Sequence, residues 1–149
     1  MVQVAPGVRL MTVSPGRRPD KPLMLMMHGF PESWYSWRHQ MDRFKDEYDV
    51  VAVDMRGYGE SDKPPGVDSY HLSKLVADVG EAVAGLGHST CTLVAHDWGG
   101  VVAWLAAAVR PGVVDRLVVM AAPHLGLSSV NMDLRQAMMS WYILLFQAP

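Results

Sequence analysis

The sequence comprises 149 residues, 50% of them hydrophobic, which is enough for one domain with a substantial core. The formal net charge is only −2 and the 13 Lys and Arg residues are scattered, so the composition excludes a partner recognised through a basic stripe, such as nucleic acid. Pro and Gly interrupt the N-terminal apolar runs and no run approaches the ~18 residues of a membrane helix, so neither a signal peptide nor a membrane span is predicted.

The first part of the chain predicts strands and one helix. Short strands at residues 2–4 and 8–13 flank a Pro-Gly turn, and a polar loop leads to the continuous apolar run Leu23–Met27. Such a run is typical of a strand that is buried on both faces, and residues 50–53 predict another. Ser33 is placed to cap a helix. The apolar positions of that helix recur at helical spacing: Trp34, Trp37, Met41 and Phe44.

The second part continues this alternation. A turn-rich loop covers residues 54–62, and residues 70–86 repeat apolar side chains on one helical face. Residues 90–95 and 113–120 predict two more buried strands, and residues 98–109, which are apolar nearly all round, predict a buried helix between them. This order of elements predicts an α/β fold, with a mainly parallel sheet and helices on both faces.

The pattern changes after Pro123. Residues 131–147 predict one helix that is rich in Met and aromatic side chains, and no strand follows it. We therefore expect a boundary between the sheet-containing part of the chain and its C-terminal segment.

Asp97 stands between a predicted strand and a predicted helix, in the sequence Ala-His-Asp-Trp-Gly-Gly. This is the layout of a nucleophile elbow, with Asp where many hydrolases carry Ser. Ligands bind at the carboxyl ends of the strands in open α/β sheets, which is where Asp97 is expected. An Asp can simply cap a helix, but Gly99 and Gly100 would let the strand and helix approach closely, as a sharp elbow requires. An Asp nucleophile forms an alkyl–enzyme ester, which indicates a substrate with an electrophilic carbon.

The loop His28-Gly29-Phe30-Pro31 follows another buried strand, so we expect it at the same rim of the sheet. Its backbone N–H groups, with that of Trp98, are suited to an oxyanion hole, where one donor stabilises a transition state by roughly 3 kcal/mol. Taken alone, the loop is equally an ordinary turn. The two signals together, in this order along the chain, favour a catalytic interpretation.

Three motifs carry a resemblance to a known family: His28-Gly29-Phe30-Pro31-Glu32-Ser33-Trp34, Asp54-Met55-Arg56-Gly57-Tyr58-Gly59-Glu60-Ser61 and His96-Asp97-Trp98-Gly99-Gly100. Together they resemble the α/β-hydrolase fold family, and within it the epoxide hydrolase branch. Haloalkane dehalogenases typically carry Asn at the place of Phe30, and fluoroacetate dehalogenases typically carry Arg at the place of Trp98, so these branches match less well.

The resemblance implies roles for residues in this chain. Asp97 matches the nucleophile, and Phe30 and Trp98 match the residues whose backbone N–H groups form the oxyanion hole. Near the C-terminus, Tyr142 stands five residues before Gln147, the spacing at which the family's cap domain places a tyrosine that hydrogen-bonds the epoxide oxygen.

The resemblance also implies a division of the chain. Residues 1–123 would form the N-terminal part of the hydrolase core, and residues 124–149 the beginning of a truncated cap. The family's catalytic histidine, its partner acid and its second cap tyrosine have no matching position in these residues. We therefore expect apolar surface to be exposed at one edge of the sheet.

The implied reaction is the attack of Asp97 on a carbon of a small apolar epoxide, followed by hydrolysis of the alkyl–enzyme ester to a diol by water. No cofactor and no metal is implied. Without a histidine to activate the water, we expect this chain alone to be inactive or limited to a single turnover.

None of the six histidines is predicted to be that base. His96 is expected to point away from Asp97 because neighbouring side chains alternate at a strand end, and His28 is expected to support its loop. His124 follows the last predicted strand and has no evident carboxylate partner. The remaining three are expected at the surface: His39, His71 and His88.

Two alternatives stay open. One is a haloalkane dehalogenase-like hydrolase, which Phe30 disfavours because it lacks a side-chain amide to help hold a halide. The other is a non-enzymatic truncated isoform that binds a partner through an open sheet edge. The single cysteine, Cys91, is expected to be a small buried side chain. A cytoplasmic location is favoured, with a membrane anchor upstream of Met1 in a longer product as the alternative.

Overall fold

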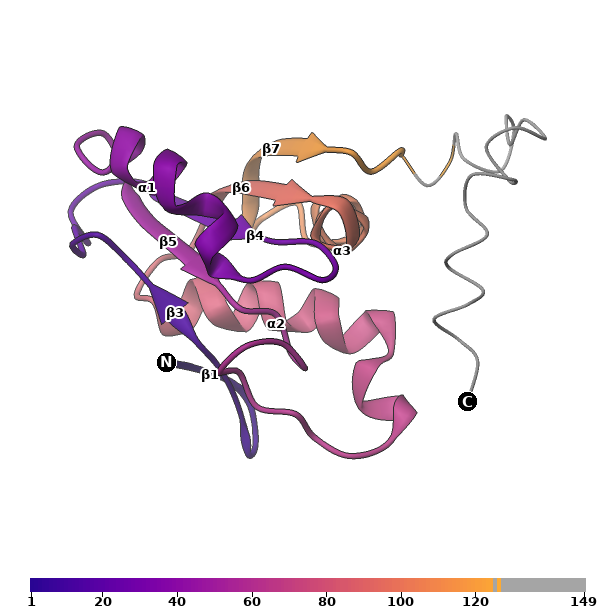
Figure 1. The fold of residues 1–149 in the computed structure, drawn as a ribbon. Coiled ribbons are helices and arrows are strands. Elements are labelled where there is room, and N and C mark those ends of the chain that lie inside the picture. Colours follow the sequence, from indigo (N-terminus) through magenta and orange to yellow (C-terminus); the bar gives the residue numbers. More distant parts are fainter. Residues whose placement is uncertain (125, 127–149) are drawn as a thin grey trace.

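The computed structural model describes residues 1–124 and 126 (Figure 1). The predicted helix at residues 131–147, the predicted cap segment and Tyr142 lie outside these residues. The strands are β1 (Val2–Ala5), β2 (Val8–Leu10), β3 (Thr12–Val13), β4 (Leu23–Met27), β5 (Asp49–Val53), β6 (Cys91–His96) and β7 (Val114–Met120). The helices are η1 (Trp34–Trp37), α1 (Arg38–Phe44), η2 (Val67–Tyr70), α2 (Leu72–Gly85) and α3 (Asp97–Val109), where η marks a short 3-10 helix.

A 5-stranded sheet with the order β3-β5-β4-β6-β7 forms the centre of the described chain. β4 pairs in parallel with β5 and β6, β6 pairs in parallel with β7, and β3 is antiparallel to β5, so the predicted mainly parallel sheet is confirmed. The chain leaves β4 for β5 on one side and then crosses to β6 on the other. The order of the strands along the sheet therefore reverses direction between β4 and β6. In open α/β sheets, ligands bind outside the carboxyl ends of the strands at such a switch point.

Helices cover both faces of the sheet, as predicted (Figure 1). All of β4 is buried, and its side chains alternate between two cores. Met24 and Met26 pack with Met41 of α1 on one face. Leu23 and Leu25 belong to the larger core on the opposite face, which α2 and α3 cover. Each fully buried side chain of this size stabilises the fold by about 1.5–3 kcal/mol, so burial on both faces makes β4 the centre of the domain.

The segment 8–13 was predicted as one strand, and this prediction is wrong. β2 pairs with β1 in a separate 2-stranded sheet, whereas β3 joins the main sheet beside β5. Met11 separates them because its N–H donates to Ser61 Oγ at 2.8 Å and its carbonyl accepts from the Asp54 N–H at 3.0 Å. A distant loop thus takes the hydrogen bonds that a continuous strand would have used.

The helix expected after Ser33 is present, although its first turn is the 3-10 helix η1. The Ser33 hydroxyl accepts from the Tyr35 N–H at 3.4 Å, and Trp37 and Met41 are buried as the spacing predicts. The helix predicted at residues 70–86 is α2, and it begins after His71. In α3 the residues from Gly99 to Ala107 are buried or half-buried, and its last turn is exposed.

Strand β7 was predicted to be buried, and this prediction is wrong. Only Val114 is buried, because among residues 1–124 and 126 the one strand beside β7 is β6. Leu117 and Val119 pack against the larger core, whereas Val118 and Met120 are 47% and 41% exposed. The expected apolar exposure at one edge of the sheet is therefore confirmed for this strand.

His88 was predicted at the surface, and this prediction is wrong as well. Its side chain is only 11% exposed, and its Nε2 lies 2.9 Å from Oδ2 of the fully buried Asp49. His39 and His71 are exposed, as predicted. Cys91 is a buried free thiol, as predicted, and burial raises its pKa to about 12. Among the described residues, no helix has the length and apolar character needed to cross a bilayer.

Candidate active site

Asp97 occupies a strained turn between β6 and α3. Its φ is +50°, a left-handed conformation that few residues other than glycine adopt, although Asp and Asn tolerate it better than most. Such strain persists only where the surrounding structure holds it, and it concentrates at functional sites. The chain passes from extended backbone at His96 directly into the helix. This is the geometry of the predicted elbow.

Glycines let the elbow approach its neighbours. A Cβ added to Gly99 would lie 2.5 Å from the carbonyl oxygen of His28, and a Cβ added to Gly100 would lie 2.6 Å from the Cβ of Ala122. Real Cβ atoms do not come so close to other atoms. The close approach of strand and helix that the two glycines predict is therefore present in the structure.

The loop after β4 meets Asp97 at the same rim. The Phe30 N–H donates to Oδ1 of Asp97 at 2.9 Å. A Cβ on Gly29 would lie 2.7 Å from that oxygen and 2.5 Å from the Asp97 Cβ, so only glycine fits there. The predicted meeting of the two loops is confirmed, and a backbone donor of one loop reaches the carboxylate of the other.

Trp98 supplies the second predicted backbone donor. It is the second residue of α3, so its N–H belongs to the first turn and has no acceptor inside the helix. The N-terminus of a helix also carries partial positive charge, which favours an anion beside Asp97.

Aromatic residues lie near Asp97 at this rim of the sheet. The side chains of Phe30 and Trp98 are 42% and 50% exposed. The half-buried Tyr58 packs edge-on against Phe30, with ring centroids 6.4 Å apart. Burial raises the pKa of the Tyr58 phenol, and the nearby Asp97 carboxylate raises it further. This surface suits an apolar ligand.

Asp54 is a second carboxylate at this end of the sheet, and its environment differs from that of Asp97. It is 1% exposed, and its oxygens accept from the Trp34 N–H at 2.7 Å and from the Glu60 N–H at 3.2 Å. Both oxygens of Asp54 thus hold loops in place. By contrast, no group in residues 1–124 or 126 donates a hydrogen bond to Oδ2 of Asp97.

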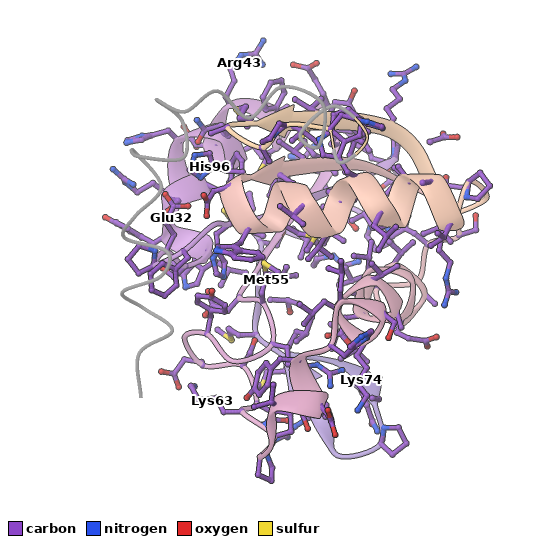
Figure 2. The ribbon with its side chains drawn as sticks, turned by 90° about the vertical axis from the view of Figure 1, so that its right-hand side faces the viewer. Glu32, Arg43, Met55, Lys63, Lys74 and His96 are labelled. Atoms are coloured by element: carbon purple, nitrogen blue, oxygen red, sulfur yellow. The ribbon has the colours of Figure 1, made fainter. Side chains whose placement is uncertain are left out.

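Glu32 forms a hydrogen-bonded pair with His96 beside the elbow (Figure 2). Its Oε2 lies 3.1 Å from His96 Nδ1 and accepts from the Gly29 N–H at 3.0 Å. Burial raises the pKa of the Glu32 carboxyl, but the hydrogen bonds from Gly29 and His96 together hold the pKa below its usual value. The His96 ring therefore lies against Glu32, in line with the prediction that it points away from Asp97.

The pair borders a hollow of about 210 Å³ next to the site. Its other lining residues are Ser36, Trp37, Gln40 and Met120. This hollow could hold water close to the elbow.

His28 supports its loop, as predicted. The ring is fully buried; its Nδ1 lies 2.7 Å from the Gly29 carbonyl oxygen, and its Nε2 accepts from the Met55 N–H at 3.0 Å. His124 is exposed, its ring packs edge-on against Trp104, and no carboxylate in the described chain pairs with it. Within that part of the chain, no group of three or more His, Cys, Asp or Glu residues lies together as a metal site would require.

Sequence reasoning missed Glu32 and Tyr58. Both belong to loops that follow buried strands, β4 and β5, and loops in that position point to the rim of the sheet. That signal was available for Tyr58. The hydrogen bond of Glu32 to Gly29, three residues earlier, depends on the conformation of the loop and has no sequence signature of its own.

Comparison with known proteins agrees with this geometry. Residues 22–145 match the family described as "alpha/beta hydrolase fold". The chain is 53% identical over 118 residues to "Epoxide hydrolase 4" of Mus musculus, covering 79% of this chain and 33% of that protein. It is 44% identical over 145 residues to "Epoxide hydrolase 3" of Xenopus tropicalis, covering 96% of this chain and 39% of that protein.

Solved structures give the same result. An epoxide hydrolase from metagenomes of hot environments superposes with a TM-score of 0.90 at 36% identity, covering 99% of this chain and 50% of that one. A mutant epoxide hydrolase from Bacillus megaterium, complexed with its diol product, superposes with a TM-score of 0.84 at 40% identity over 95% of this chain and 49% of that one. The chain thus spans between a third and a half of the length of these relatives. The elbow, the loop that meets it and these similarities show that the chain belongs to the α/β-hydrolase fold family, in its epoxide hydrolase branch.

Proposed function

We propose that this chain carries the nucleophilic part of an epoxide hydrolase active site, with Asp97 as the nucleophile. An oxygen of Asp97 forms a bond to an epoxide carbon while that carbon's bond to the ring oxygen breaks, and the ring oxygen takes up a proton that comes from the solvent. Water then hydrolyses the alkyl–enzyme ester, which releases the diol, restores the Asp97 carboxylate and returns one proton to the solvent. The names of the similar proteins support the choice of an epoxide.

The hydrogen bond from the Phe30 N–H to Oδ1 of Asp97 is the observation that carries this proposal. It fixes one carboxylate oxygen and leaves Oδ2 without a donor among the described residues, so Oδ2 is the oxygen that attacks. Asp54 is a poor candidate because backbone N–H groups engage both of its oxygens.

The N–H groups of Phe30 and Trp98 form the proposed oxyanion hole. They stabilise the negative charge that develops on the ester oxygen when water attacks, and each such donor contributes roughly 3 kcal/mol to transition-state stabilisation. Tyr142, in the segment 124–149 that we assign to the start of a cap, is the proposed hydrogen-bond donor to the epoxide oxygen. Residues 1–123 are assigned to the hydrolase core.

The proposed substrate is a small apolar epoxide. The exposed side chains of Phe30 and Trp98 and the half-buried ring of Tyr58 support this choice, because they place apolar surface beside the carboxylate.

For the 149-residue chain alone we expect alkylation without turnover. His96 precedes Asp97 in an extended backbone, where adjacent side chains point to opposite faces, and its ring bonds Glu32 instead. His88 lies with Asp49, which begins β5, at the opposite end of the sheet. Neither histidine is placed to activate a water that attacks the ester.

Intact-mass measurement tests the nucleophile. Folded protein incubated with styrene oxide is expected to gain the mass of one epoxide, and peptide mapping is expected to locate it on Asp97. The D97N variant keeps the shape of the side chain and its tolerance of the left-handed conformation, and it is expected to gain nothing. D115N changes an exposed carboxylate on β7 and is the matched control, which should react like the wild type. A folded wild-type protein that gains no mass would refute the proposal.

The two alternatives give different results. A haloalkane-type site would be alkylated by a chloroalkane with release of chloride, and we expect no such adduct because Phe30 provides no side-chain amide. A non-enzymatic isoform that acts by binding a partner would itself form a defined dimer as its concentration rises, whereas aggregation would indicate a mere fragment.

A further inference from the structure

The peptide unit between Gly29 and Phe30 is held at both of its polar atoms. Its carbonyl oxygen lies 2.7 Å from His28 Nδ1, and its N–H donates to Asp97 Oδ1 at 2.9 Å. In a trans peptide the C=O and N–H bonds point in opposite directions within one plane. Whatever fixes the carbonyl oxygen of Gly29 therefore also fixes the direction of the Phe30 N–H.

The surrounding contacts set the proton on His28. The Met55 N–H can only donate, and it lies 3.0 Å from Nε2, so Nε2 must be the acceptor. The proton of the neutral imidazole is then on Nδ1, where it is donated to the Gly29 carbonyl. Nδ1 of His28 therefore donates a hydrogen bond, and Nε2 accepts one.

The ring is also enclosed. His28 is fully buried, and Tyr58 packs edge-on against it with centroids 4.8 Å apart. The Gly29 carbonyl oxygen also accepts from the Glu32 N–H at 3.0 Å, so His28 and Glu32 together use both of its lone pairs. On the other side of Gly29, its N–H is held by Glu32 Oε2 at 3.0 Å, so the two peptide units that flank this residue are both fixed.

We propose that His28 is a positioning residue for the nucleophile: by donating from Nδ1 to the Gly29 carbonyl, it aims the Phe30 N–H at Oδ1 of Asp97 and so turns Oδ2 toward the substrate. The effect of His28 on reactivity rests on the proposed nucleophilic role of Asp97. The effect of His28 on the orientation of the Phe30 N–H is independent of that role.

Two variants of His28 each keep one of the two hydrogen bonds of the ring and remove the other. In H28N the side-chain amide nitrogen takes the place of Nδ1 and keeps the bond to Gly29, while the bond to Met55 is lost. In H28Q the amide oxygen takes the place of Nε2 and keeps the bond from Met55, while the bond to Gly29 is lost and the Glu32 N–H alone holds that carbonyl oxygen. Each variant removes one buried hydrogen bond, so we expect similar losses of thermal stability.

The rate of alkylation by styrene oxide is expected to differ between them. H28N should stay within about threefold of the wild type, whereas H28Q should be slower by about tenfold or more, because a donor displaced by an ångström loses much of its effect. H88N changes another largely buried histidine at the opposite end of the sheet; it should lower the melting temperature and leave the rate unchanged. Equal slowing in H28N and H28Q, or a faster H28Q, would overturn the proposal.

A measurement in solution tests the geometry without the reaction. In ¹⁵N-labelled protein, the Phe30 amide proton is expected to resonate downfield and exchange slowly in the wild type and in H28N, and to lose both properties in H28Q. If the wild type gains no epoxide but the Phe30 amide behaves in this way, the proposed function fails and the role of His28 stands. If H28Q does not fold, the ring ¹⁵N shifts of wild-type His28 decide the question: a proton on Nε2 contradicts the proposal.

Discussion

Single atoms decide how closely α3 approaches the end of β4. The carbonyl oxygen of His28 occupies the place where a side chain on Gly99 would begin, and Oδ1 of Asp97 lies where a side chain on Gly29 would. The backbone of one loop and the Asp97 carboxylate of the other therefore meet at a distance that no larger residue allows. This contact places the Phe30 N–H within hydrogen-bonding range of Asp97.

Replacing Gly99 by Ala tests this contact. The added methyl group would lie 2.5 Å from the His28 carbonyl oxygen, a backbone atom that cannot rotate away. We expect G99A to lower the free energy of unfolding by about 1–3 kcal/mol, as overpacking generally does. Urea denaturation measures the change.

Gly112 provides the control, because nothing lies within 4 Å of its added Cβ. G112A is expected to stay within about 0.5 kcal/mol of the wild type. Equal losses in the two variants would mean that the close approach of α3 is not what makes Gly99 necessary.

At this scale the sequence predicts the elbow but only part of its surroundings. Asp97, Gly99 and Gly100 are recognisable because a sharp elbow between a strand and a helix needs small residues. Glu32 is not, because its contacts with Gly29 and His96 exist only once two loops have met.

At the scale of elements, a buried carboxylate joins loops at the end of the sheet opposite the elbow. Asp49 begins β5, and its oxygens bind Arg17 at 2.8 Å, the Arg18 N–H at 2.8 Å and His88 at 2.9 Å. Arg17 also donates to the carbonyl oxygen of Leu86 at the end of α2. This cluster ties the loop before β4 to the loop before β6.

The cluster predicts a dependence of stability on pH. Burial raises the pKa of the Asp49 carboxyl, but Arg17, the Arg18 N–H and His88 together hold the pKa below its usual value. A carboxyl with a lowered pKa in the folded state stabilises the fold above the pKa of the unfolded chain, and this contribution is lost as the pH falls through the folded pKa. D49N is therefore expected to cost about 3 kcal/mol at neutral pH, since it leaves Arg17 without its charged partner.

Unfolding free energies of the wild type and D49N, measured from neutral pH down to about pH 3, test this expectation. The difference should shrink as the pH falls, because protonated Asp49 resembles Asn. A difference that stays constant over this range would contradict a lowered pKa of Asp49.

The pattern of apolar residues in a short stretch of sequence predicts a helix or strand well when its hydrogen bonds are local or when it is completely buried. Leu23–Met27 has the bounds of β4, since this strand is buried on both faces. The segment 8–13 was predicted wrongly because Met11 bonds to a loop some 50 residues away. His88 was predicted wrongly because its partner, Asp49, is 39 residues away along the chain. Contacts of this kind leave no trace in a short stretch of sequence.

At the scale of the whole molecule, the edge of the sheet at β7 exposes apolar side chains. β7 carries Val118 and Met120 at the surface, and its outer edge has no neighbouring strand among the described residues. Exposed, unpaired strand edges associate with other chains. We therefore expect the 149-residue chain to self-associate as its concentration rises.

Lysine at Val118 is expected to suppress this association with little change in stability, because the side chain is already 47% exposed. V67K makes the same substitution at a residue that is 89% exposed and lies in η2, outside the sheet. Analytical ultracentrifugation over a range of concentrations should show less association for V118K only. A wild type that remains monomeric, or an equal effect of V67K, would exclude the edge of β7 as the cause.

The strand order has a consequence for how the chain folds. Phe30 and Asp97 are 67 residues apart, and they meet because β4 and β6 are neighbours in the sheet while β5 and α2 lie between them in the chain. Closing so long a loop costs entropy that only the completed β4–β6 pairing can offset. The hydrogen bond between Phe30 and Asp97 should therefore form late in folding and break early in unfolding, so a partly folded chain should hold an Asp97 carboxylate whose Oδ1 still lacks this donor.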